Sequence, residues 1–218
     1  MASLVAAGAA ALATSPPAGA STRPVLGSAY GYAAKVSLFG SPPFTMAATP
    51  KVTLPKGGSA SPVIGSAPSG QVAFGPAILF SSGPISVLTL GSNGSATSVA
   101  SLESVGNSPF TANFVQSTCT SAAGAPLGVT TISNGVVVTS TDPMGAPLTK
   151  MAVPVAPPPD FTIAGTLQAN GSTEHFKWVF NQQTTNANGS LTVNAAHEIL
   201  QGPAVVGNII IGHSSCRG

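Results

Sequence analysis

Proline and glycine are spread along almost the whole sequence, and this distribution limits the fold more than any other feature does. The chain has 20 prolines and 25 glycines among its 218 residues. Proline removes a backbone donor and clashes with the preceding helical turn, and glycine weakens a helix through its flexibility. Few windows between these residues are long enough for a helix of typical length. The sequence therefore predicts a chain built from strands and turns.

Short apolar or alternating runs, separated by glycine, proline and asparagine, fill the sequence from residue 28 onward. Examples are QVAFGPAILF at residues 71–80, PISVLTL at 84–90 and GVTTISNGVVVTS at 128–140. Turn signals that recur about every 8 to 12 residues are typical of a sandwich or barrel. We therefore expect an all-β fold, an antiparallel β-sandwich of Ig-like or jelly-roll-like type with roughly ten short strands.

A proline-rich segment, MAVPVAPPPD at residues 151–160, interrupts this pattern. Four of its ten residues are proline, so it cannot join a central strand and is expected to form an extended crossover. If the chain were divided into two domains, the boundary would fall in this segment. Because 43% of the residues are hydrophobic, the chain can bury one core of ordinary size. We expect residues 21–218 to form a single domain.

The first twenty residues, MASLVAAGAAALATSPPAGA, have the features of a secretory signal peptide. An apolar stretch at residues 4–13 is followed by two prolines and by Ala18-Gly19-Ala20, a pattern that signal peptidase cleaves. The positively charged start of such a signal is missing, and the alternative is an alanine-rich helix packed on the domain. No other stretch reaches the roughly 18 consecutive apolar residues of a membrane helix. We expect a secreted, extracellular protein that is either free or associated with the cell surface.

Charged side chains are scarce and scattered. They make up 6% of the residues, against about 25% in an average globular protein, so the surface must consist largely of uncharged polar groups. Binding of nucleic acid requires clustered lysine and arginine that displace counterions. The seven basic residues form no cluster in the sequence and argue against a nucleic-acid partner: Arg23, Lys35, Lys51, Lys56, Lys150, Lys177 and Arg217.

A hairpin is predicted near the end of the chain. The segments EHFKWVFNQQ and SLTVNAAHEIL flank TTNANG, whose asparagine and glycine suit a tight turn. A turn centred between Ala187 and Asn188 would place Lys177 opposite Glu198 and Trp178 opposite His197. Opposite charges would then pair on one face of the hairpin, and a slip of one residue would undo this arrangement.

The two cysteines, Cys119 and Cys216, are far apart in the sequence and each lies in a strand-like run. An even number of cysteines in an exported chain indicates a disulfide, and a pair of buried free thiols is the alternative. A catalytic thiol is disfavoured because His213, three residues before Cys216, would point to the opposite face of a strand.

Histidines supply the candidates for a transition-metal site. A zinc or copper ion would need His175, His197 and His213, with Glu174 or Glu198 as a fourth ligand. The sequence contains no His-x-His or Cys-x-x-Cys pair to anchor such a site. His175, His197 and Glu198 are therefore weak candidates, and we expect no metal.

Five carboxylates are the candidates for calcium binding or for glycoside hydrolysis: Glu103, Asp142, Asp160, Glu174 and Glu198. No two of them form an Asp-x-Asp pattern, and nothing in the sequence selects a facing pair. The sequence also lacks a nucleophile elbow and a glycine-rich phosphate loop. We therefore expect no catalytic residue and no cofactor.

Three segments carry a family resemblance: GSAYGYAAKVSLFG at residues 27–40, STCT at 117–120 and NGSLTVNAAHEILQGPAVVGNIIIGHSSC at 188–216. They resemble the choice-of-anchor P proteins, which are exported mainly by actinobacteria and other Gram-positive bacteria. The resemblance implies a secreted or surface protein of β-rich architecture with no assigned enzymatic activity. Anchored members end in an anchoring tail, whereas this chain ends two residues after Cys216, so covalent attachment to the cell wall is not expected.

Three functional hypotheses follow. The first is a non-enzymatic secreted or cell-surface protein with a structural or adhesive role, which binds a glycan or a protein through polar, uncharged faces. The second is a self-assembling fibre or sheath subunit whose strand edges pair between copies, with residues 23–39 as the donor strand. The third is a secreted hydrolase that uses a pair of carboxylates.

Overall fold

The computed structural model describes residues 24–218 except residues 75–76, 107–108, 123–124 and 170, so the predicted signal peptide lies outside the described residues. The described part forms fifteen strands and no helix, as the spread of proline and glycine predicts. The strands are β1 (Leu26–Leu38), β2 (Phe44–Thr53), β3 (Ser59–Ala67), β4 (Gly70–Phe74), β5 (Ala77–Ser82), β6 (Ile85–Ser92), β7 (Ser95–Gly106), β8 (Phe110–Ala122), β9 (Ala125–Ser133), β10 (Val136–Thr141), β11 (Pro147–Ala152), β12 (Phe161–Ala169), β13 (Ser172–Thr185), β14 (Leu191–Gln201) and β15 (Val205–Arg217).

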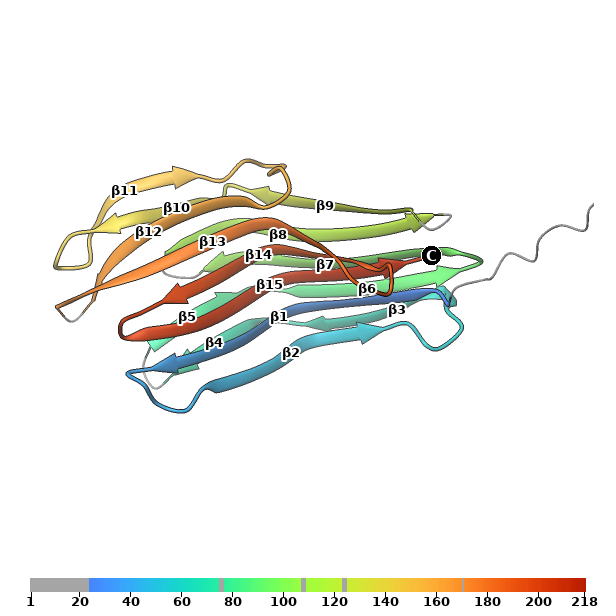
Figure 1. Ribbon diagram of the computed structural model, residues 1–218, viewed down its shortest axis with the longest axis horizontal. Helices are drawn as coiled ribbons and strands as arrows, with labels where there is room; N and C mark the ends of the chain where they lie inside the picture. The colour runs from blue at the N-terminus through green and yellow to red at the C-terminus, as the bar shows by residue number, and fades with distance from the viewer. Residues whose placement is uncertain (1–23, 75–76, 107–108, 123–124, 170) are drawn as a thin grey trace, which may run out of the picture.

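Two layers of antiparallel strands face each other across the core (Figure 1). The front layer has the order β2-β1-β15-β14-β13-β12, and the back layer has the order β3-β6-β7-β8-β9. At the borders, β10 pairs with both β8 and β12, and β5 of the β4–β5 hairpin pairs with β7. The strand β11 pairs with β10. All the described strands therefore belong to one continuous sheet, which is nearly closed in the manner of a barrel.

The all-β class and the disulfide are confirmed, but the described strands number fifteen rather than the expected ten or so. Two of the apolar runs in the sequence account for part of the difference. The run at residues 71–80 is divided between β4 and β5, and the run at 128–140 is divided between β9 and β10. Each run contains a glycine near the point of division. In the sequence alone, a glycine that ends a strand cannot be distinguished from a glycine inside a strand.

A transverse irregularity, here called the crease, crosses four strands of the front layer at Gly31, Gly212, Ala195 and Asn181. Regular pairing stops at this row and resumes beyond it without a shift of register. In β1, β14 and β15 the buried positions change between odd and even numbers across the row. The φ angles of Gly212 and Asn181 are positive, 64° and 49°. Such a conformation interrupts the alternation of side chains along a strand.

The crease divides the core into two ends. At the aromatic end the rings of Phe110 and Trp178 lie 4.9 Å apart, those of Trp178 and Phe180 5.7 Å apart, and those of Tyr32 and Phe80 4.9 Å apart. All five of these side chains are buried. Large rings therefore fill the space between the layers on this side of the crease.

At the disulfide end the two layers come much closer together. Cys119 of β8 and Cys216 of β15 form the predicted disulfide, with their Cα atoms 5.6 Å apart, whereas facing sheets usually lie about 10 Å apart. No aromatic ring belongs to the described core of this end. The hydroxyl groups of Thr89 and Ser98 lie 2.8 Å apart there and are fully buried. The remaining apolar members of this end are Val25, Leu54, Ala96, Leu191 and Val193.

The predicted hairpin exists, but its predicted register is wrong by one residue. Lys177 lies opposite Ile199, Trp178 opposite Glu198 and Val179 opposite His197. The loop between the strands has five residues, and the backbone N–H of Asn186 donates to the carbonyl of Ser190 at 2.8 Å. The centre of this loop is Asn188, whereas the prediction placed it at the peptide bond between Ala187 and Asn188. Each residue of β13 is therefore paired with the residue one position further along β14. Glu198 therefore shares the inner face with Trp178 and does not lie opposite Lys177.

Two further expectations concern segments at the borders of the sheet. Residues 153–160 form the extended crossover, which begins after β11, so Met151 and Ala152 belong to an edge strand. The prediction that residues 23–39 are a donor strand is wrong for β1, because β1 pairs on one side with β2 and on the other with β15. Both of its edges are therefore used within the same chain.

Candidate functional site

The outer face of the back layer, here called the uncharged face, is made of side chains without charge. In the middle of this face the strands β3, β6, β7, β8 and β9 alternate regularly, and their register sets the outward side chains in rows. The hydroxyl row consists of Ser66, Ser86, Ser101, Gln116 and Thr131. The apolar row beside it consists of Ile64, Leu88, Val99, Thr118 and Val129. Glu103 is the one carboxylate, and no lysine, arginine or histidine occurs, in the described residues of these strands.

Apolar side chains on this face are open to solvent. Ile64 is 64% exposed and Val129 45% exposed, and Leu127, one row further along β9, is 63% exposed. Exposed apolar side chains that gather on one face mark a contact surface more often than isolated ones do. The uncharged face therefore offers both apolar area and hydroxyl groups to another molecule.

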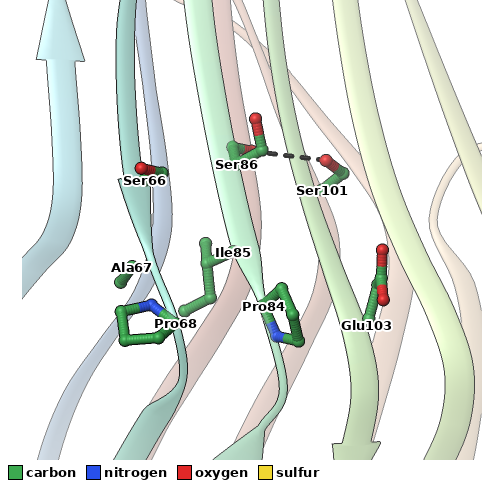
Figure 2. Close-up of a pocket in the computed structure, with 8 residues that line it drawn as sticks. All are labelled: Ser66, Ala67, Pro68, Pro84, Ile85, Ser86, Ser101 and Glu103. Atoms are coloured by element: carbon green, nitrogen blue, oxygen red, sulfur yellow. Dashed lines mark hydrogen bonds between the residues drawn. The ribbon is translucent and has the colours of Figure 1, made fainter.

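A cleft of about 480 Å³ lies at one corner of the uncharged face (Figure 2). Its wall includes the rings of Pro68 and Pro84 and the side chain of Ile85, and its other lining residues come from β3, β6 and β7. The Oγ of Ser101 donates to the carbonyl oxygen of Ser86 at 3.3 Å. The cleft is lined by Ser66, Ala67, Pro68, Pro84, Ile85, Ser86, Ser101 and Glu103. It combines hydroxyl groups with a single carboxylate, so it can exchange hydrogen bonds with a ligand rich in hydroxyl or amide groups.

The outer face of the front layer differs in charge. Lys35 and Lys51 are exposed and Lys177 is half-buried on this face, whereas Glu174 and Glu198, the two carboxylates of the described front-layer strands, are buried. The front layer therefore has a positive outer surface without an outward carboxylate in its described strands. Three lysines over six strands are nevertheless a sparse charge.

A row of polar side chains, here called the polar ladder, crosses five strands beside the crease. Cross-strand pairing aligns its members, which are Lys51, Tyr30, His213, Asn194 and Gln182. The Nδ1 of His213 lies 2.8 Å from the Oδ1 of Asn194, and the Nδ2 of Asn194 donates to the Oε1 of Gln182 at 2.8 Å. The ring of Tyr30 stacks on His213 with centroids 4.1 Å apart. His197 joins the network, because its Nδ1 lies 2.9 Å from the Oε1 of Gln182.

Burial controls ionisation in the polar ladder. Burial, and secondarily the positive charge of Lys51, lower the pKa of His213 from 6.5 to about 4. Burial and the charge of Lys177 lower the pKa of His197. Burial raises the pKa of Tyr30 to about 12. These groups are therefore neutral at neutral pH, and since an amide oxygen only accepts, each imidazole Nδ1 carries the proton.

The weak metal candidates are not brought together. His197 points outward from β14, whereas Glu198 points into the core, because neighbouring strand residues face opposite sides. His175 lies two outward rows from His197, next to the turn that its backbone N–H holds by donating to Gly202. Over the described ranges, no three histidine, cysteine or acidic side chains are close enough to hold a metal ion.

The placement of His213 follows the sequence prediction. His213 lies on the outer face against Tyr30, and Cys216 is buried in the disulfide on the inner face. The imidazole is therefore on the opposite side of β15 from the sulfur.

Three carboxylates accept hydrogen bonds from backbone amides, two of them in turns and one in strand β13. Glu174 accepts from the N–H groups of Ala204 and Val205, at 3.0 and 3.1 Å. Asp142 accepts from the N–H groups of Met144 and Ala146 at 2.9 and 2.8 Å. In the same way Asp160 accepts from the N–H of Gln183 at 3.2 Å. Glu174 and Asp142 therefore act as turn caps, and Asp160 ties the crossover to β13.

Sequence reasoning missed the uncharged face and the polar ladder. The signal for the uncharged face was present in SATSVASLESVG at residues 95–106, where serine, threonine, valine and alanine alternate without a charge until Glu103. Alternation alone does not say which strands lie side by side, so the rows were not visible. For the polar ladder no sequence signal existed, because its five members come from five strands.

No family model, no curated protein and no solved structure matches this chain. In the part of the chain that the structure describes, no helix has the length and apolar character that crossing a bilayer requires.

Proposed function

We infer that the protein is a non-enzymatic, secreted or cell-surface β-protein with a structural or adhesive role, which binds an uncharged ligand at the cleft and along the adjoining hydroxyl row. The observation that carries this inference is the uncharged face, where hydroxyl groups and apolar side chains alternate beside a cleft with one carboxylate. Neutral glycans present the same mixture of hydroxyl groups and apolar C–H surfaces. A polyanion would find no lysine or arginine on the described part of this face.

Other features support a binding rather than a catalytic role. Glu174, Asp142 and Asp160 hold backbone amides of turns or of β13, and Glu103 is the one carboxylate that lines the cleft. A glycoside hydrolase would need two carboxylates that face each other across a substrate. The inter-layer disulfide suits an extracellular location, where such bonds persist.

The proposal extends to family and fold type. Membership of the choice-of-anchor P family rests on the three segments that resemble it, of which the last forms β14 and β15 and contains Cys216. The finer description as an Ig-like or jelly-roll-like sandwich rests on the two facing layers. Because β10 pairs with both β8 and β12, the two layers are joined into one sheet and are not two independent sheets.

The binding proposal is tested by blocking the cleft. Ser86 is exposed at the cleft, and Thr53 is exposed on the outer face of the front layer. We expect Ser86→Phe to weaken co-sedimentation of the full chain with an insoluble neutral polysaccharide by at least about tenfold, which corresponds to 1.4 kcal/mol. The matched variant Thr53→Phe should bind as the unaltered chain does. Equal binding by both variants, or no binding by the unaltered chain to any neutral polysaccharide or cell wall, contradicts the proposal.

Self-assembly through strand edges is the second candidate, and β11 favours it. All six residues of β11 are exposed, Leu148 by 65% and Met151 by 48%, and among the described strands β11 pairs with β10 alone. An open edge of this kind can add a strand from another copy. Electron microscopy of the concentrated protein should then show fibres that Leu148→Pro abolishes. A solution without fibres at every concentration argues against this candidate.

A further inference from the structure

The apolar row lies in the middle of the uncharged face, away from the cleft. Its central member is Val99 of β7, the third of five strands in the order β3-β6-β7-β8-β9. The row is flanked on one side by the hydroxyl row and on the other by Leu90, Thr97, Thr120 and Leu127. The half-buried Leu88 and Val99 and the exposed Ile64 and Val129 form an apolar band across the strands, in which Thr118 of β8 contributes a hydroxyl group between Val99 and Val129.

We propose that a second copy of this chain docks on the uncharged face, with the apolar row of one copy against the apolar row of the other. Glu103 and the cleft lie at the border of that contact. The inference does not depend on the ligand proposed for the cleft, because it is argued from the apolar row, but a contact over the whole face also covers the hydroxyl row, so a second copy and that ligand would compete.

Charge favours a second copy over other protein partners. The described residues of the five strands hold Glu103 as their single carboxylate and no basic side chain, so stacking two such faces buries no unpaired charge in the middle of the contact. The whole chain has a formal net charge of only +2, so two copies repel each other weakly. A partner with a charged surface would instead lose the hydration of its charges without compensation.

The area is that of a stable interface. Neighbouring strands lie about 4.8 Å apart, and successive outward side chains on one strand lie about 6.8 Å apart. Five strands and about five outward rows then cover roughly 24 Å by 34 Å, which is close to the 800 Å² that each partner contributes to a standard interface. The face is therefore large enough to hold two copies together by itself.

Symmetry makes the contact self-complementary. Two identical faces in contact are related by a two-fold axis that lies between them. An axis that passes beside Val99, along the row or along β7, lays the apolar row on its own copy. Val99 lies on both axes, so in both cases its side chain faces Val99 of the second copy.

This position allows a test by charge. Val99→Lys and Val99→Glu each place like charges in direct opposition, which costs several kcal/mol, so each variant alone should associate more than about 100-fold more weakly. An equimolar mixture of the two variants places lysine against glutamate and should restore the dimer. The unaltered full chain should sediment at twice its mass of 21.3 kDa. Analytical ultracentrifugation measures all four samples.

Control variants separate this contact from others. Ile210→Lys changes a half-buried side chain on the outer face of the front layer, and Leu148→Lys changes the open edge at β11. Both should leave the dimer intact. If Val99→Lys does not fold, as judged by the near-ultraviolet circular dichroism of the buried Trp178, then Val99→Thr keeps the β-branched shape and should still weaken the dimer several-fold.

The outcomes decide the proposal. A dimer of the unaltered chain that Val99→Lys and Val99→Glu each break and that their mixture restores supports it. A monomer at all accessible concentrations overturns it. A dimer that survives both charged variants overturns it as well and points to another contact, such as β11. Monomeric variants that fail to combine show that Val99 does not face its copy and reject the proposed stacking.

Discussion

The front and back layers follow the same alternation of buried and outward side chains but use it differently. The back layer keeps a regular alternation through the apolar row and the hydroxyl row and breaks it beyond them, at Ser104 of β7, whose φ is 47°. Its outward side chains carry no charge apart from Glu103 at the corner. The front layer is interrupted by the crease, and its outward side chains include lysines, imidazoles and amides. Polar groups beside the crease bond to one another, so they support the fold, whereas the regular layer presents a plane that is suited to contact with another molecule.

The disulfide joins the two layers covalently, and its removal should lower the free energy of unfolding more than any other change proposed here. Cys119 and Cys216 are 97 residues apart in the sequence, and closing a loop of that length stabilises a fold by about 4–5 kcal/mol in the chain-entropy model. Urea unfolding of the double variant Cys119→Ala/Cys216→Ala should show a loss approaching this value. A loss below about 1 kcal/mol would mean that the layers hold together without the bridge.

The crease should be less tolerant of a side chain than a turn of the back layer is. Gly212 has a φ of 64°, and a Cβ added there would lie 3.1 Å from the Cβ of Ala195. Gly94 of the β6–β7 hairpin has a φ of 77°, but an added Cβ would meet nothing within 4 Å. We expect Gly212→Ala to lower the free energy of unfolding by about 2–4 kcal/mol, from strain and crowding together. Gly94→Ala should cost about 1–2 kcal/mol, from backbone strain alone. Equal losses would contradict the crowding at the crease.

Stability should depend on pH through the front layer. The pKa of His213 is 6.5 as a free side chain and about 4 in the fold, so below pH 6.5 the unfolded chain takes up a proton that the folded chain refuses. The stabilisation is complete above pH 6.5 and is lost as the pH falls through about 4, by about 3 kcal/mol in total. The lowered pKa of His197 acts in the same direction.

The control for this pH dependence is His213→Gln, which removes the titrating ring and keeps a polar side chain. Chemical denaturation at a series of pH values measures both proteins. The variant should lose most of the slope between neutral and acidic pH, and a slope equal to that of the unaltered chain would assign the dependence to other groups.

The smallest expected losses of stability compare one hydrogen-bonded side chain on the outer face of each layer. Asn194 is 8% exposed and bonds both His213 and Gln182, so Asn194→Ala should cost about 1–2 kcal/mol by leaving partners without hydrogen bonds. Ser101 of the hydroxyl row donates one long bond, 3.3 Å, to the backbone of Ser86, so Ser101→Ala should change stability by less than about 0.5 kcal/mol. Thermal unfolding of both variants measures the difference. A larger loss for Ser101→Ala would show that the hydroxyl row supports the fold.

Sequence patterns predicted those features that depend on composition and on local alternation. The spread of proline and glycine predicted the all-β class, the two cysteines predicted the disulfide, and strand alternation predicted that His213 and Cys216 face opposite sides. Each of these inferences needed information from one segment alone or, for the disulfide, from two cysteines that can pair only with each other.

Features that depend on tertiary arrangement were not predictable in the same way. The register of the last hairpin failed because the five-residue loop at Asn186 to Ser190 is centred one half-residue from the expected position. The crease was invisible because Asn181 and Gly212 adopt positive φ angles that alternation patterns do not reveal. The rows of the uncharged face required the order of five strands, and β3 reaches that layer only through a crossover from β2.

The central claim is that the uncharged face is the surface through which this protein contacts other molecules, including its own copies. Methyl-resolved NMR spectra of the full chain, recorded from micromolar to millimolar concentration and then with a neutral glycan, test this most directly. The account predicts that the signals of Ile64, Leu88 and Val99 shift, while those of Ile199 and Ile210 on the front layer stay in place. Shifts that gather on the front layer, or spectra that do not change at all, would contradict it.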